Sequence, residues 1–169
     1  MRIFSSRLLA VLLALVALGS LSARAEGPIL TITYAGKTTS FSADDFAALP
    51  HQDVEAFDAH QKKSHKYSGV PAHDLLVKAG TPTGEKLRGA ALRLVVVAHS
   101  KDNYAVTYAL AEFESAFNAR TIYLVDQEDG NAMGEGAGPL RFVIPGDARP
   151  ARWARMITSL EVVSVGEGR

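Results

Sequence analysis

The chain of 169 residues contains no cysteine, so it can form no disulfide bond and can offer no thiolate to a metal ion. It also has no excess of positive charge, because 18 acidic residues balance 18 basic ones. A chain without such an excess is poorly suited to hold a nucleic-acid backbone. We find no internal repeat, low-complexity segment or linker. A domain of this composition must be stabilised by its hydrophobic core alone.

The N-terminus has the three parts of a secretory signal peptide. Arg2 and Arg7 supply the positive charge, residues 8–18 form a short apolar run, and Ala23-Arg24-Ala25 is an A-x-A cleavage site. The alternative is an uncleaved membrane anchor. Cleavage after the first 25 residues would release one domain, residues 26–169, with 15 basic and 18 acidic side chains, into the periplasm. The two arginines of the leader are separated, so the sequence has no twin-arginine pair.

Short apolar runs alternate with turn residues along the rest of the chain, which is typical of an α+β domain rather than a parallel βαβ fold. Ser42 followed by Asp45 predicts a helix start, and Pro50 its end. Residues 67–71 predict a turn into a short helix that stops at Gly80. We expect another helix at residues 110–117 and a strand with an irregular loop at 51–66. Further strands are expected at 29–34, 38–41, 92–98, 104–108, 121–125, 140–144 and 157–165.

Four segments of the sequence carry a resemblance to a known family. They are Phe41-Ser42 with Phe46 and Leu49-Pro50, Tyr67-Ser68-Gly69-Val70-Pro71 with Asp74-Leu75-Leu76 and Ala79-Gly80, Asp102 to Val106, and Gly138 to Trp153. In this order they resemble the molybdopterin-binding domain of the sulfite-oxidase type. The last segment, GPLRFVIPGDARPARW, is similar to that family's pterin-side signature. The resemblance implies a sulfite-oxidase-like fold, with mixed and antiparallel sheets, short helices and a pterin pocket.

The family's enzymes hold molybdenum through a cysteine, and ungapped counting places Phe57 nearest to that position. Phenylalanine cannot bind a metal ion. Exported enzymes of the family normally cross the membrane folded around their cofactor by the twin-arginine route, whereas this leader is of the general secretory type. The chain is therefore similar to cysteine-free periplasmic pterin-binding proteins of the PruR type. These bind a pterin without molybdenum and regulate an inner-membrane cyclic-di-GMP enzyme.

The resemblance thus implies a pterin-binding regulator that is not an enzyme. A molybdopterin-dependent oxidoreductase of the sulfite or sulfoxide type is one alternative, and an interaction domain without a ligand is another. The five histidines, at positions 51, 60, 65, 73 and 99, suggest a metal site, but their spacing matches no zinc or copper pattern closely. A Ser-His-Asp hydrolase has no nucleophile-elbow motif to support it.

A pterin pocket needs a stacking plane, a carboxylate for the N3–H and 2-amino group, and donors for O4 and the ring nitrogens. We expect Trp153 to stack, Arg141 and Arg152 to donate, and Asp102 or Glu135 to supply the carboxylate. Arg141 lies in an apolar strand, where an arginine needs a partner. The remaining expected pocket residues are Phe57, His99, Ser100, Asn103 and Tyr104. For each of these residues an ordinary place in the core, in a turn or on the surface is the alternative.

Overall fold

The structure, a computed structural model, describes residues 27–166. The predicted signal peptide and its cleavage site therefore lie outside the described residues. Within the described range no helix has the length and apolar character needed to cross a membrane. Strands dominate and the helices are short, so the prediction of an α+β fold is confirmed.

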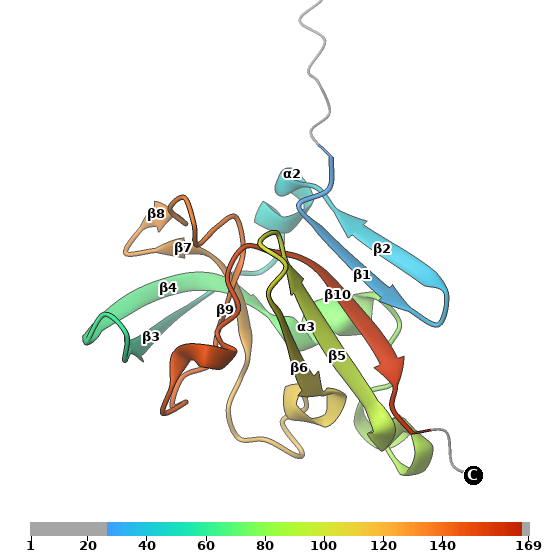
Figure 1. Ribbon diagram of the computed structural model, residues 1–169. Helices are drawn as coiled ribbons and strands as arrows, with labels where there is room; N and C mark the ends of the chain where they lie inside the picture. Colours follow the sequence, from blue (N-terminus) through green and yellow to red (C-terminus); the bar gives the residue numbers. More distant parts are fainter. Residues whose placement is uncertain (1–26, 167–169) are drawn as a thin grey trace, which may run out of the picture.

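The first of two sheets has the strand order β2-β1-β10-β5-β6. Its strands are β1 (Leu30–Tyr34), β2 (Lys37–Phe41), β5 (Leu94–Ser100), β6 (Ala105–Ala109) and β10 (Ile157–Ser164). The last strand of the chain, β10, lies between β1 and β5, parallel to the first and antiparallel to the second (Figure 1). The C-terminal strand is therefore central to this sheet.

The second sheet is antiparallel and has the order β3-β4-β7-β8, with β9 also paired to β7. Its strands are β3 (Gln52–Asp58), β4 (Lys63–Pro71), β7 (Tyr123–Glu128), β8 (Asn131–Ala132) and β9 (Arg141–Val143). The helical segments are α2 (Ala43–Ala47), α3 (Ala72–Lys78) and the 3₁₀ turns η1 (Gly84–Lys86), η2 (Gly89–Arg93), η3 (Leu110–Phe113) and η4 (Pro150–Arg152). In Figure 1 the η4 turn, in orange-red, lies on the same side of the molecule as the β3–β4 hairpin.

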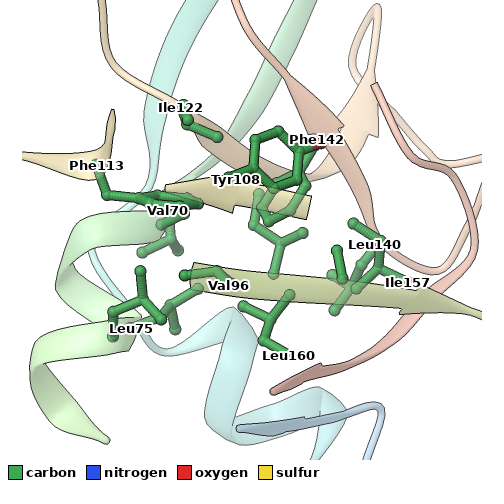
Figure 2. Close-up of a cluster of buried hydrophobic side chains, with 14 of the residues drawn as sticks. Val70, Leu75, Val96, Tyr108, Phe113, Ile122, Leu140, Phe142, Ile157 and Leu160 are labelled. Carbon is green, nitrogen blue, oxygen red and sulfur yellow. The ribbon is translucent and has the colours of Figure 1, made fainter. Parts of the chain in front are cut away.

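The hydrophobic core lies between the two sheets and α3 (Figure 2). Tyr108 of the first sheet packs edge-to-face on Phe142 of the second, with their ring centres 5.3 Å apart. Phe113 of η3 lies against the same tyrosine at 5.7 Å. Edge-to-face contacts stabilise the packing beyond what burial of the rings contributes, and they fix how the two sheets face each other. The strand that carries Phe142 also carries Arg141, so the core positions that arginine.

Several sequence-based predictions agree with the structure. Ser42 and Asp45 form the expected capping box at the start of α2, with each side chain bonded to the other residue's backbone N–H. The strands predicted at 29–34, 38–41, 104–108, 140–144 and 157–165 lie within about two residues of observed ones. The strand predicted at 121–125 is β7, which begins and ends later.

Other predictions are wrong in ways that burial explains. Residues 67–71 belong to β4 rather than to a turn, because Gly69 carries no side chain and lets β7 approach closely. Residues 110–117 form only the turn η3, since Phe117 is exposed and the apolar face does not continue. The region at 51–66 is a hairpin of two regular strands, β3 and β4. The strand predicted at 92–98 begins at Leu94, because residues 92 and 93 end η2.

Gly69 gives a direct test of this packing. A Cβ added at Gly69 would overlap the Leu124 carbonyl oxygen and the Val125 Cα. We expect Gly69→Ala to lower the free energy of unfolding by about 1–3 kcal/mol, measured by urea denaturation. Gly134→Ala is the matched control, because a Cβ there meets no atom within 4 Å, and it should change stability by less than about 0.5 kcal/mol. Equal stabilities of the two variants would contradict the close approach.

Candidate functional site

A cleft of about 660 Å³ opens between the β3–β4 hairpin, the turn after β5 and the η4 segment. The hairpin contributes residues 58–61, and the turn after β5 contributes Asp102 and Tyr104. Glu128 lies in β7, Ala137 in the loop between β8 and β9, and Arg141 in β9. The η4 segment supplies residues 149–151 and 153–155. These segments are far apart in the sequence, so only the assembled fold creates the cleft.

The floor of the cleft is a buried ion pair. Arg141 is 5% exposed and Asp58 only 2%. Arg141 Nη2 donates a hydrogen bond of 2.8 Å to Asp58 Oδ2. Asp58 Oδ1 accepts hydrogen bonds from the backbone N–H groups of His60, at 2.8 Å, and Gln61, at 3.2 Å. The pair therefore joins β9 to the hairpin that forms one wall of the cleft.

These contacts determine the protonation of Asp58. Burial by itself raises the pKa of the carboxyl, but the hydrogen bonds from Arg141 and from the two backbone N–H groups outweigh it. The pKa of Asp58 therefore lies below its ordinary value. At neutral pH both partners are charged, and the positive charge of Arg141 is balanced within the floor.

Two aromatic rings enclose the guanidinium group of Arg141. Its central carbon lies 5.4 Å from the centre of the Trp153 ring and 5.7 Å from that of Tyr67. Both distances are in the range of a cation–π contact. Burial raises the pKa of Tyr67 to about 12, so its phenol remains neutral beside the ion pair. Trp153 is only 3% exposed, so its ring does not present an open face for stacking.

Two donors in this floor have no hydrogen-bond partner among residues 27–166. They are Arg141 Nε and the indole Nε1 of Trp153, and both are buried. A buried donor without an acceptor costs about 1–3 kcal/mol. The floor therefore contains two buried donors that are unsatisfied in this conformation.

The mouth of the cleft is polar and partly aromatic. Tyr104 is 49% exposed, and its hydroxyl donates to the Ala151 carbonyl oxygen at 2.9 Å, which fixes the ring across the entrance. Its backbone N–H donates to Asp102 Oδ1 at 3.0 Å. The Oδ2 oxygen of Asp102 accepts no hydrogen bond from the described residues and can receive one from a ligand. Arg149 and Arg155 are exposed along the same wall.

Four of the residues expected in the pocket line this cleft: Arg141, Trp153, Asp102 and Tyr104. Arg152 lies elsewhere, because its Nη1 pairs with Glu112 Oε2 at 2.8 Å and its guanidinium covers the Tyr108 ring at 5.2 Å. It lines a second, smaller cavity of about 440 Å³. Arg152 thus belongs to a charge network on the other side of η4.

Five further residues expected in the pocket also lie outside the cleft. Phe57 is 57% exposed, because alternation along β3 turns it to the opposite face from Asp58. His99 lies on β5, 3.7 Å from Glu161 of β10, and Ser100 is buried at the end of the same strand. Asn103 occupies a turn with positive φ, and Glu135 is exposed in the loop before β9.

Sequence reasoning missed several lining residues, among them Asp58, His60, Glu128, Arg149 and Arg155. One signal pointed to Asp58. An arginine inside an apolar strand needs a carboxylate, and the search for that partner could have included the acidic residues of β3. Nothing in the sequence distinguishes the arginines at 149 and 155 from ordinary surface charges.

The residues of the cleft do not fit molybdenum. The chain has no thiolate, and both carboxylate oxygens of Asp58 already accept hydrogen bonds. Across residues 27–166 the histidines and carboxylates form no group of three or more that could hold a metal ion. His65 and His73, for example, pair with separate carboxylates, Asp129 and Glu114. What the arrangement offers is a set of fixed donors and acceptors around a small cavity.

No protein-family model matches the sequence, and no curated protein matches it. Among solved structures the chain is similar to the sulfane dehydrogenase SoxCD from Paracoccus pantotrophus, with a TM-score of 0.59 and 18% identity. The similarity covers 82% of this chain and 39% of that one. At this identity the likeness shows the fold alone, and the fold is sulfite-oxidase-like, as the sequence motifs implied. The chain spans well under half of that enzyme's length.

The ion pair predicts a pH-dependent effect of Arg141→Met. This change keeps the side-chain bulk but leaves Asp58 buried without a counter-ion. We therefore expect the free energy of unfolding to fall by about 3–5 kcal/mol at neutral pH. In the wild type the low pKa of Asp58 stabilises the fold above about pH 3.9, and this contribution is lost as the pH falls through the folded value. Without Arg141 the pKa of Asp58 rises, so protonation relieves part of the defect in acid.

Urea denaturation at pH 7 and near pH 4 measures the effect. The stability difference between the wild type and Arg141→Met should narrow at the lower pH. Arg155→Met, an exposed arginine of the same cleft, is the control and should stay within about 0.5 kcal/mol of the wild type. A difference that is the same at both pH values would show that Asp58 does not carry the effect.

Proposed function

We propose that this chain is a periplasmic protein that binds a free pterin in the cleft and performs no molybdenum chemistry. One observation carries the proposal: a sulfite-oxidase-like fold encloses a cleft whose floor is the buried Arg141–Asp58 pair, in a chain without cysteine. The volume of about 660 Å³ lies within the range of about 300–1,000 Å³ that is usual for small-molecule sites.

The side chains of the cleft match the chemistry of a pterin ring. The guanidinium group of Arg141, which lines the cleft, suits the O4 and ring-nitrogen acceptors. Asp102 has a free carboxylate oxygen for the N3–H and 2-amino group. Tyr104 offers an exposed ring held across the entrance, which suits stacking better than Trp153, whose ring contacts Arg141. In this assignment Asp102, and not Glu135, accepts hydrogen bonds from the aminopyrimidine edge of the pterin.

The alternative, a molybdopterin-dependent oxidoreductase, draws support from the fold and from the enzyme SoxCD that shares it. Such an enzyme needs a protein ligand for the metal, and the chain contains no cysteine to provide one. The pterin-binding function therefore has the stronger chemical support.

A regulatory role completes the proposal. The sequence is similar to PruR-type proteins, which regulate an inner-membrane cyclic-di-GMP enzyme through its periplasmic domain. The mouth of the cleft, with Tyr104, Arg149 and Arg155 exposed, offers that domain a surface on which a bound pterin would be sensed directly. We propose that the protein signals the presence of pterin to such a partner.

Fluorescence titration with neopterin tests the pocket. Tyr104→Ala should weaken binding by up to about tenfold, through loss of ring stacking. Asp102→Asn should weaken it by about ten- to a hundredfold, through loss of a charge-assisted hydrogen bond. Glu135→Gln removes the same charge outside the cleft and should bind as the wild type does.

Two results would overturn these assignments separately. If the wild type does not bind neopterin, the proposed function fails. If the wild type binds it but Glu135→Gln weakens binding while Asp102→Asn does not, the ring occupies a different site.

A further inference from the structure

The positive charge of Arg141 is balanced by Asp58 before any ligand enters the cleft. Its Nη2 group is bonded to Asp58 Oδ2 at 2.8 Å, and both side chains are almost completely buried. The second oxygen of Asp58 accepts two backbone N–H groups of the hairpin. The carboxylate is therefore fixed from both sides, and the floor of the cleft carries no net charge.

An isolated arginine in such a floor would be a strong site for an oxyanion, because guanidinium donors match sulfate, phosphate and similar groups. Here Asp58 already balances the charge of Arg141, through the hydrogen bond to Nη2. An entering oxyanion would therefore gain little net attraction from the floor and would place a second negative charge beside the buried carboxylate. Binding that broke the buried pair would be still less favourable.

We propose that Asp58 determines the ligand class of the cleft, by neutralising Arg141 so that the floor accepts an uncharged heteroaromatic ring and rejects oxyanions such as sulfate and molybdate. The preference for a ring rests on the proposed function, whereas the rejection of oxyanions does not. Asp58 acts through Arg141 and is in this sense a positioning residue.

Asp58→Asn is the informative variant, because an asparagine side chain has nearly the same shape and its oxygen can still accept from the His60 and Gln61 N–H groups. The substitution removes the negative charge and also replaces the Oδ2 acceptor of Arg141 Nη2 by an NH2 donor, so Arg141 loses its partner in the floor. Trp153 is the single tryptophan of the chain and lies 5.4 Å from Arg141, so its fluorescence reports on the floor without any pterin. We expect sulfate and molybdate to bind Asp58→Asn at least about tenfold more tightly than the wild type.

Two variants serve as controls for that measurement. Asp102→Asn removes a charge from the same cleft but not from Arg141, and it should bind sulfate within about twofold of the wild type because exposed charges are screened. Asp58→Asn combined with Arg141→Met removes both charges of the floor. It should return sulfate binding to the wild-type level and thereby identify Arg141 as the anion site.

The proposal is overturned if folded Asp58→Asn binds sulfate and molybdate no better than the wild type, or if Asp102→Asn gains as much affinity. The wild type provides a test that does not depend on the folding of any variant. If sulfate at neutral pH changes its Trp153 fluorescence with an affinity equal to that for neopterin, Asp58 does not exclude oxyanions. If the wild type binds neither sulfate nor neopterin, the exclusion of oxyanions stands and only the proposed pterin function fails.

Discussion

The ion pair between Arg141 and Asp58 is the interaction on which the site depends. It joins residues 83 positions apart and ties the end of β3 to β9, two strands that do not pair with each other. Two charges in a protein interior are costly to desolvate, and their attraction compensates only when further hydrogen bonds and close contacts support them. Here the hairpin N–H groups and the rings of Tyr67 and Trp153 provide that support.

The site combines a rigid floor with an adaptable mouth. Arg141 and Trp153 are held by the same core that packs Phe142 against Tyr108, so the floor can be altered only at a cost in stability. Tyr104, Arg149 and Arg155 lie in loops at the surface, where a substitution lowers the stability of the fold less. This division places the residues that fix the cleft in the core and the residues that can vary at its mouth.

The sequence predicted the features that depend on local order. The capping box of Ser42 and Asp45 and most strands follow from nearby residues, and the apolar surroundings of Arg141 show that it needs a partner. The identity of that partner depends on how β3 and β9 meet, which no local pattern records. Likewise Arg152 and Trp153 are adjacent in the sequence, but they serve different cavities because η4 turns between them. Gly69 was misread as part of a turn because its role is to admit β7, a neighbour from far along the chain.

Analysis of any small molecule that remains bound to the protein when it is purified from its native cells tests the central claim most directly. Mass spectrometry of the released ligand, together with metal analysis of the same sample, distinguishes the possibilities without a choice of probe. The account predicts a pterin and no stoichiometric molybdenum. Recovery of molybdopterin with bound molybdenum would contradict it.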